Sequence, residues 1–385
     1  MIPYGRQDIT QADIEAVIEV LRSDFLTQGP QVPSFEQKLA TYCGASHAVA
    51  VNSATSALHI ACLALGLSEG DYLWTSPLTF VASANCALYC GARVDFVDID
   101  RHDWNISTFA LEQKLHIAEL EGRLPKIVVP VHLCGRPCDM KTIHGLSLRY
   151  GFKIIEDASH AIGARYDNEP VGNCRYSDIT VFSFHPVKII TTAEGGAALT
   201  NQAALAERMA LLRSHGITRE PRQMSRAPDG PWYYEQTDLG FNYRMTELQA
   251  ALGISQMDRL DAYVSRRHKL AMRYDELLAR LPIITPCKDA VGISSMHLYV
   301  IRIQLDKVTN THLEIFTALR ARGVGVNLHY IPVYKHPYYK SLGFHDLYCV
   351  EADKYYLEAI SLPLYSELDY MTQEYIAESL KSVLS

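Results

Sequence analysis

The sequence predicts an α/β fold built on a mostly parallel sheet, followed by a smaller α+β domain. Between about residues 45 and 200, short β-rich apolar runs alternate with helical segments. That order builds parallel sheets covered by helices on both faces. The chain has 385 residues, of which 48% are hydrophobic, so it can form one large core and a second, smaller one.

The elements of the large domain follow in chain order. Residues 9–22 have the spacing of an amphipathic helix. The strands expected in the sheet are residues 48–52, 72–75, 93–97, 127–131, 153–156 and 180–184. Residues 214–234 combine glycine, proline and arginine, which is typical of an exposed loop. Residues 246–280 predict long helices that end at Leu281-Pro282.

The pattern changes in the last part of the chain. Residues 297–303 and 325–328 predict two strands, with a helix between them at residues 311–322. A short mixture of strands and helices of this kind indicates a small α+β domain. We therefore predict a large domain of residues 1–250, including the N-terminal helix, and a small domain of residues 251–385.

Composition excludes several classes of function. The net charge is −7 and the basic residues are dispersed, so neither nucleic acid nor an anionic membrane is an expected partner. No apolar run is long enough to span a bilayer, and the first residues lack signal-peptide features, so we expect a cytoplasmic protein. The nine cysteines are scattered and are expected to be reduced, with no metal site.

Lys188 is the first candidate for chemistry. A β-rich run at residues 180–184 is followed by His185-Pro-Val-Lys188 and then by a loop that ends in Glu194-Gly-Gly196. This layout presents a single amine on a loop after a strand, where it could react with a bound aldehyde. Lys188 is therefore a candidate Schiff-base lysine.

An acid and a histidine follow another predicted strand. Residues 153–156 lead directly into Asp157 and His160, and ligands of parallel α/β sheets bind beyond the carboxyl ends of the strands. A carboxylate there could keep the nitrogen of a pyridoxal ring protonated, which lets the ring accept electrons. Taken alone, Asp157 could equally be a helix cap.

Small hydroxylated residues between a strand and a helix suggest a phosphate site. Residues 52–58 read Asn-Ser-Ala-Thr-Ser-Ala-Leu, and a helix start next to Thr55 and Ser56 favours a phosphate. The alternative is a plain N-cap at Ser53 or Thr55. The glycine-rich phosphate motifs G-x-G-x-x-G and G-x-x-x-x-G-K-[ST] are absent, which argues against dinucleotide-binding and P-loop proteins.

Two further residues lie on loops that could face a ligand. Phe80 follows the predicted strand at residues 72–75 and could lie flat on a cofactor ring, although such aromatics more often belong to the core. Asn242 precedes the helix predicted from residue 246 and could reach a partner group. The alternative for Asn242 is an ordinary turn or cap residue.

Together these motifs resemble the DegT-type family of pyridoxal-phosphate-dependent sugar aminotransferases. The family has the aspartate-aminotransferase-like fold (fold type I), with a mostly parallel seven-stranded sheet. The resemblance covers essentially the whole chain and rests on five motifs in the family's order. These are Thr-Gln-Gly-Pro (27–30), Asn-Ser-Ala-Thr-Ser-Ala-Leu (52–58), Glu-Asp-Ala-Ser-His (156–160), Ser-Phe-His-Pro-Val-Lys (183–188) and Asn-Tyr-Arg-Met-Thr-Glu-Leu-Gln-Ala (242–250).

The resemblance implies roles for the candidate residues. Lys188 would form the internal aldimine with pyridoxal 5′-phosphate, Asp157 would pair with the pyridine nitrogen, and His160 would lie beside the ring. These three are the implied catalytic residues. The remaining implied cofactor contacts are Phe80 on the ring, Thr55, Ser56 and Ser183 at the phosphate, and Asn242 reaching over from the neighbouring protomer. The last contact implies a homodimer with shared active sites.

Within the family, residues 23–29, 51–60 and 182–185 are most similar to the PseC-type branch of pseudaminic acid biosynthesis. That branch transfers an amino group from L-glutamate, which leaves as 2-oxoglutarate, to C4 of a UDP-linked 4-keto-6-deoxy-N-acetylhexosamine, with pyridoxamine phosphate as the intermediate. The match implies a place in the glycosylation of flagella or other surface structures. The implied substrate contacts are Tyr4, Asp24, Phe25, Leu26, Thr27, Ser56, His329, Tyr330, Ile331 and Pro332; for His329 and Tyr330 the alternative is ordinary loop packing.

Other readings stay open. A related aminotransferase could act on another dTDP-, GDP- or UDP-linked ketosugar. The family's dehydratase branch has histidine in place of the lysine, so Lys188 argues against it. Amino-acid aminotransferases of this fold hold a carboxylate with an arginine of the small domain, whereas residues 327–339 offer aromatics, His329 and Lys335. A non-catalytic ligand-binding relative would not need Lys188, Asp157 and His160 together.

Overall fold

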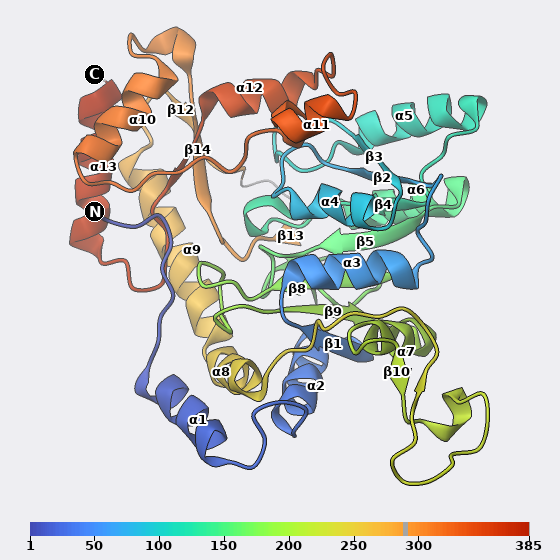
Figure 1. The fold of residues 1–385 in the computed structure, drawn as a ribbon. Helices are drawn as coiled ribbons and strands as arrows, with labels where there is room; N and C mark the ends of the chain where they lie inside the picture. Colours follow the sequence, from blue (N-terminus) through green and yellow to red (C-terminus); the bar gives the residue numbers. More distant parts are fainter. Residues whose placement is uncertain (288–291, 385) are drawn as a thin grey trace.

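The large domain is built on a seven-stranded sheet. The computed structural model describes residues 1–287 and 292–384, and the sheet lies at its centre (Figure 1). Its strand order is β1-β9-β8-β5-β4-β2-β3. The strands are β1 (His47–Val51), β2 (Tyr72–Thr75), β3 (Arg93–Phe96), β4 (Ile127–Val129), β5 (Lys153–Asp157), β8 (Ile179–Ser183) and β9 (Gly196–Thr200).

Only β9 runs against its neighbours in this sheet. It is antiparallel to β1 and to β8, and the other neighbouring strands are parallel. The mostly parallel seven-stranded sheet is thus confirmed, and six of its strands coincide with predicted ones. The sequence did not predict β9, because Gly196-Ala-Ala-Leu-Thr200 is made largely of residues with low strand propensity.

Helices cover both faces of the sheet. One face packs against α3 (Ala54–Ala64), α4 (Ala82–Tyr89) and α7 (Ala203–Leu212). The other face is covered by two groups of helices, α5 (Thr108–Glu121) with α6 (Met140–Tyr150), and α2 (Gln31–Cys43) with α8 (Glu247–Met257). Because both faces are covered, β4 and β8 are buried along their whole length, whereas β3 at the edge of the sheet carries an exposed Arg93.

The C-terminal part has its own core around a small antiparallel sheet. The sheet contains β12 (Ile283–Ile284), β14 (Tyr299–Ile303) and β15 (Ala359–Leu362), and it packs with α9 (Leu260–Leu277), α10 (His312–Ala321) and α13 (Tyr370–Leu384). The helices α11 (Pro337–Ser341) and α12 (Val350–Glu358) complete this part. The predicted strand at residues 325–328 is wrong, since Asn327 forms only an isolated bridge with Ser361. Gly325 instead donates its N–H to the Ile2 carbonyl at 2.7 Å.

Three short pairings lie outside these sheets. β6 (Arg165–Tyr166) pairs with β7 (Glu169–Pro170) and with β13 (Gly292–Ile293). The segment predicted as an exposed loop at residues 214–234 contains β10 (Ile217–Thr218), which pairs with β11 (Glu235–Gln236). This segment projects away from the body of the molecule at the lower right of Figure 1.

The N-terminal segment lies against the C-terminal part of the chain. Ile2 bridges to Val324, and the Tyr4 carbonyl accepts the N–H of Leu364 at 3.0 Å. Farther on, α1 (Gln11–Arg22) packs against α8. The predicted domain boundary at residue 250 falls inside α8 and stays a prediction. In the described part of the chain, no helix has the length and apolar character needed to cross a membrane.

Candidate active site

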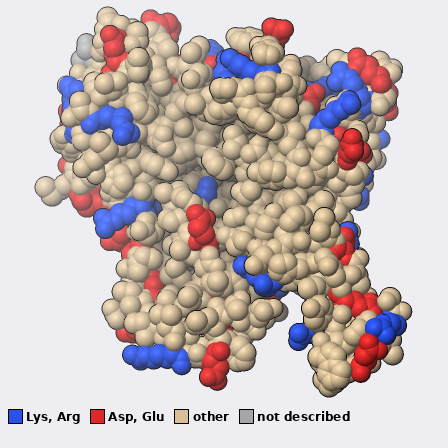
Figure 2. Space-filling model, viewed as in Figure 1, with Lys and Arg blue, Asp and Glu red and all other residues tan. Residues whose placement is uncertain are grey.

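A cavity of about 800 Å³ lies at the carboxyl ends of the sheet strands. Its wall includes residues that directly follow β1, β2, β5 and β8, and the C-terminal part supplies the opposite side. This is where open α/β sheets bind their ligands. The face in Figure 2 is hollowed near its middle, where a few charged side chains show among mostly uncharged ones.

Lys188 lines this cavity from the loop after β8. Its backbone N–H donates to the His185 carbonyl at 2.8 Å, which closes a turn, and the N–H of Thr192 returns to the Phe184 carbonyl at 3.0 Å. Burial lowers the pKa of the Lys188 amine to about 8, and the nearby Asp157 carboxylate limits the fall. A useful fraction of the amine is therefore neutral near pH 7 to 8, as a nucleophile or general base requires.

Asp157 faces the same cavity from the end of β5. Its Oδ2 accepts the Ser83 hydroxyl at 2.5 Å, and its Oδ1 accepts the Ser159 N–H at 3.1 Å. Thr79 Oγ1 lies 2.6 Å from Ser83 Oγ, so Thr79 donates to Ser83 while Ser83 donates to the carboxylate. These bonds orient the carboxylate and leave it lone pairs for one more donor from the cavity.

Ser83 and Thr79 did not stand out in the sequence. They are four residues apart, Thr79 in the loop after β2 and Ser83 at the start of α4, with Phe80 between them. Their spacing places both hydroxyls on one side of that turn. The spacing of the two hydroxyls can be seen in the sequence. It indicates a role at the site only when the structure shows that the end of β5 lies beside them.

His160 is a neutral ring beside Lys188. Its Nδ1 accepts the Cys134 N–H at 3.3 Å, so its proton is on Nε2, which lies 3.1 Å from the Tyr330 hydroxyl. Burial holds the pKa of His160 well below its usual range, and the positive charge of Lys188 lowers it further. Burial also raises the pKa of Tyr330, so the phenol keeps its proton.

Most of the predicted sugar-binding residues at the N-terminus and in residues 329–332 line the cavity. Tyr4, His329, Tyr330 and Ile331 all line it, whereas the buried Pro332 lies just outside the lining. His329 is held by Ser361 Oγ at 2.8 Å from its Nδ1, and burial lowers its pKa to about 3. Phe80 lines the cavity opposite, with its ring centre 6.4 Å from that of Tyr330.

The start of α3 forms another part of the wall. Ser53 caps this helix by accepting the Ser56 N–H at 3.2 Å, and Ala54 and Thr55 line the cavity, as does Ser183. Backbone N–H groups of the first helical turn have no partner inside the helix. A Cβ on Gly196 of β9 would lie 2.5 Å from the Ala54 nitrogen, so the strand can pass this close to the helix start only as glycine.

The residues that line this cavity fit pyridoxal phosphate. A helix start with unpaired N–H groups suits the phosphate, a partly neutral lysine suits the aldehyde, and a carboxylate with open lone pairs suits the protonated ring nitrogen. All three open into one cavity. The fit depends on Thr55, Lys188 and Asp157, which three separate motifs supply.

Some predicted site residues lie elsewhere in the single chain. The Ser56 hydroxyl donates to Asn52 Oδ1 at 2.7 Å beneath the helix start. Asn242 bridges to Ser214, and residues 24–27 lie in the exposed segment between α1 and α2. Within the described residues, none of these lines the cavity. Their assigned contacts stay predictions, and those of Asn242 require a second subunit.

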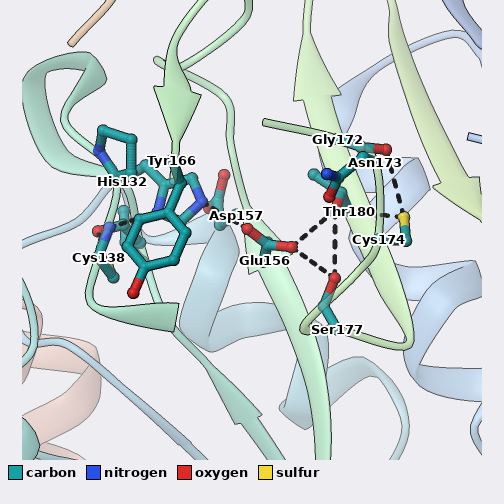
Figure 3. Close-up of polar contacts among 12 residues, drawn as sticks. His132, Cys138, Glu156, Asp157, Tyr166, Gly172, Asn173, Cys174, Ser177 and Thr180 are labelled. Atoms are coloured by element: carbon teal, nitrogen blue, oxygen red, sulfur yellow. Dashed lines mark hydrogen bonds and ion pairs between the residues drawn. The ribbon is translucent and has the colours of Figure 1, made fainter. Parts of the chain in front are cut away.

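A buried polar cluster lies next to Asp157 along β5 (Figure 3). Glu156 Oε2 is 2.8 Å from His132 Nε2, and Oε1 accepts the hydroxyls of Ser177 and Thr180, the latter at 3.0 Å. His132 Nδ1 accepts the Cys138 N–H, so the proton is on Nε2 and points at Glu156. Burial alone would raise the pKa of Glu156, but these hydrogen bonds hold it below its usual range. The cluster ties the ends of β4 and β8 to β5.

Glu156→Gln is expected to lower the free energy of unfolding by about 1–3 kcal/mol at pH 7, because an amide cannot accept from all three donors. Since the folded pKa is lowered, the carboxylate stabilises the protein above its unfolded pKa of about 4.3, and this contribution disappears as pH falls through the folded value. Urea unfolding at pH 7 and at decreasing pH would show the gap to wild type narrowing. The exposed Glu112→Gln is the control; equal losses in both variants would contradict the assignment.

Comparison with known proteins gives full-length matches. The DegT/DnrJ/EryC1/StrS aminotransferase family matches residues 7–381. The chain is 38% identical over 385 residues to the UDP-4-amino-4,6-dideoxy-N-acetyl-beta-L-altrosamine transaminase of Campylobacter jejuni, covering 100% of this chain and 98% of the relative. It is 37% identical over 386 residues to the spore coat polysaccharide biosynthesis protein SpsC of Bacillus subtilis, covering 100% and 97%.

Solved structures agree over the same length. PseC of Helicobacter pylori, an aminotransferase involved in the biosynthesis of pseudoaminic acid, superposes with a TM-score of 0.90 at 33% identity, covering 100% of this chain and 99% of that one. Spr1654 of Streptococcus pneumoniae gives a TM-score of 0.90 in its PMP-form at 30% identity, covering 100% and 99%. Its PLP-form gives 0.89 at 30% identity, covering 99% and 98%. The predicted fold class is confirmed.

Proposed function

The chain belongs to the DegT/DnrJ/EryC1/StrS aminotransferase family and is a pyridoxal-phosphate-dependent sugar aminotransferase; from this premise we propose its substrates. It transfers the amino group of L-glutamate to C4 of a UDP-linked 4-keto-6-deoxy-N-acetylhexosamine, as in pseudaminic acid biosynthesis. The observation that carries the proposal is the meeting of Lys188, Asp157 and the α3 start in one cavity. The names of the Campylobacter and Helicobacter relatives support the choice of sugar.

The protein's residues have distinct tasks in this proposal. When bound, the cofactor supplies an electron sink for a carbanion next to the amino nitrogen. Asp157 holds the proton on the ring nitrogen, and Ser83 keeps the carboxylate in place. Lys188 carries the proton to and from the substrate carbon, first with glutamate and then with the sugar. Its pKa of about 8 allows it both to accept and to release a proton near neutral pH.

Neutral groups around Lys188 support this role. His160, His297 and His329 are all buried, and burial lowers the pKa of each of them. A ring of neutral histidines adds no positive charge beside the amine, so it does not further suppress protonation of Lys188. Phe80, Tyr330 and Ile331 add apolar surface to the wall of the same cavity, which limits access of water to the proton that Lys188 transfers.

We also propose a homodimer in which each site uses both subunits. The predicted phosphate contact Asn242 and the predicted sugar contacts at residues 24–27 do not line the cavity of the single chain. Residues 24–27 are exposed and include Phe25 and Leu26, which are 52% and 51% accessible. Apolar side chains this accessible suit an interface with a second copy.

Incubation of the enzyme and L-glutamate with UDP-, dTDP- and GDP-linked 4-ketosugars tests the substrate. We expect the UDP-linked N-acetylated sugar to be converted, with NMR showing nitrogen at C4, at a kcat/KM at least tenfold above the other sugars. Preference for a sugar of another class would favour the second candidate, for which the similarity to the Bacillus spore coat protein is the supporting observation. Failure of every sugar with glutamate would refute the proposed donor and acceptor pair.

A further inference from the structure

His297 reaches the cavity from the C-terminal part, just before β14. Its side chain lines the cavity, it is 3% accessible, and its ring centre lies 4.4 Å from that of His160. The sequence indicated only the first residue of a strand at this position. The structure instead places it in the loop that precedes the strand, among the groups around Lys188.

The backbone on either side of His297 is fixed to the large domain. The N–H groups of Ser295 and His297 donate to the carbonyls of Gly135 and Cys134, each at 3.0 Å. The Ser295 hydroxyl donates to the carbonyl of His160 at 2.8 Å. The loop that carries His297 is therefore joined to the loop after β4 and to His160 itself.

Arg267 of α9 also contacts the loop that carries His297. This fully buried guanidinium donates to the carbonyls of Met296, His297 and Leu364 at 3.3, 3.1 and 2.9 Å. These bonds from a buried arginine fix the direction of the backbone at His297. The ring of His297 is thus pre-organised, as binding groups require.

The imidazole of His297 has unused hydrogen-bonding capacity. Its Nδ1 is sealed from solvent and has no hydrogen-bond partner within the described part of the chain, whereas both nitrogens of His160 and of His329 are engaged. A sealed lone pair is tolerated better than a sealed N–H, so the proton belongs on Nε2. This second nitrogen is not sealed and makes no hydrogen bond within the described part of the chain. Because the side chain lines the cavity, the Nε2–H is open to a ligand there.

The ring is also neutral. Burial holds the pKa of His297 well below its usual range, and the positive charges of Lys188 and Arg267 lower it further. It therefore offers one N–H donor and no positive charge. Such a donor can bind an anionic oxygen without holding a proton that would compete with Lys188.

The α-carboxylate of the amino-group donor needs uncharged hydrogen-bond donors of this kind. Among the described lining residues, Lys188 is the only lysine or arginine, and it must stay free to move the proton at the donor's α-carbon. The α-carboxylate is attached to that same carbon, so it must lie close to Lys188. A carboxylate removed from water without hydrogen-bond donors is strongly disfavoured.

We propose that His297 Nε2–H binds the α-carboxylate of the amino donor. This assignment rests on the proposed function and adds to it the group that recognises the donor. It makes His297 a ligand-contacting residue for the first half of the reaction and not for the sugar half. In this protein a neutral histidine binds the carboxylate, where a cationic side chain would place a second positive charge beside Lys188.

A pair of substitutions tests the proposal. His297→Leu removes the donor, and His297→Gln keeps an N–H close to the position of Nε2. Loss of a hydrogen bond to a charged group corresponds to roughly tenfold or more in affinity. We expect His297→Leu to raise the apparent Kd for glutamate in stopped-flow half-reactions by about tenfold or more, and His297→Gln to raise it less than threefold. Calorimetry of 2-oxoglutarate binding to the pyridoxal form, where no amino group is available to transfer, should show the same order.

Two readouts should change much less. In His297→Leu, the affinity for pyridoxal phosphate and the rate of the ketosugar half-reaction should each fall several-fold less than the affinity for glutamate. A glutamate affinity within twofold of wild type, or a loss confined to the cofactor or to the sugar, would overturn the assignment. Should His297→Leu not fold, as thermal unfolding would show, His297→Phe keeps the ring packing and takes its place. If wild type does not use glutamate at all, the proposed function fails first, and the same comparison is made with the donor it does use.

Discussion

Lys188→Arg is expected to abolish transamination, with a loss of about 10³-fold or more in both half-reactions. The guanidinium stays protonated throughout the accessible pH range, so it can neither attack an aldehyde nor accept a proton from the substrate carbon. The wild-type amine can do both because burial lowers its pKa to about 8. Borohydride reduction followed by mass spectrometry measures the change directly, since only a neutral amine at this position can retain the cofactor covalently.

The same amine determines a pH dependence. Below pH 8 the amine of Lys188 is mostly protonated, and above pH 8 it is mostly neutral. The rate at which cofactor-free enzyme takes up pyridoxal phosphate covalently should therefore rise with pH and level off above about pH 9. Lys153→Arg, at an exposed position at the start of β5, is the matched control and should behave like wild type. An unchanged visible spectrum and full turnover in Lys188→Arg would refute the assignment.

Asp157→Asn is expected to lower turnover about 10²- to 10³-fold, the usual cost of losing one pre-organised electrostatic group. An amide can still accept the Ser83 hydroxyl, which now bonds to Asp157 Oδ2 at 2.5 Å, but it has no charge with which to hold a proton on the ring nitrogen. Both half-reactions should slow, because both need the electron sink. Single-turnover rates with glutamate and with the ketosugar would show this.

Ser83→Ala is the informative companion to Asp157→Asn. It removes one donor and keeps the carboxylate, so we expect a loss of only about three- to tenfold, the equivalent of one ordinary hydrogen bond. Thermal unfolding of both variants would show whether the fold is retained. If Asp157→Asn kept more than a tenth of wild-type turnover, or if Ser83→Ala were the more damaging change, the carboxylate would not have the proposed role.

Much of the architecture could be read from the sequence because it is locally encoded. Six strands of the large sheet lie in short β-rich runs between helical segments, and the residues that follow them lie at the same edge because these strands run in the same direction. Lys188, Asp157 and Thr55 were singled out for this reason, and all three line one cavity. In a parallel sheet the carboxyl ends of the strands lie at one edge. The residues that follow the strands are therefore the ones expected to line a ligand cavity.

Contacts between distant segments could not be read in this way. Ser83 and Asp157 are 74 residues apart, and nothing near either residue identifies the other. His297 precedes an apolar strand, and its orientation depends on Arg267 of α9 and on Gly135 of the loop after β4. Strand β9 was not predicted. Its first residue is a glycine because Ala54 lies too close for a side chain, and strand propensity does not include such a contact.

The docking of the N-terminal segment has a consequence for the order of events during synthesis. Tyr4 lines the cavity, and its backbone is held by Leu364, while Ile2 is held through Val324 and Gly325. On a ribosome the first of these residues emerges long before its partners, so that wall of the cavity forms only after residue 364 has left the exit tunnel. Contacts of such wide sequence separation form late in folding. A nascent chain can therefore assemble its large sheet early, yet it becomes able to bind substrate only near the end of translation.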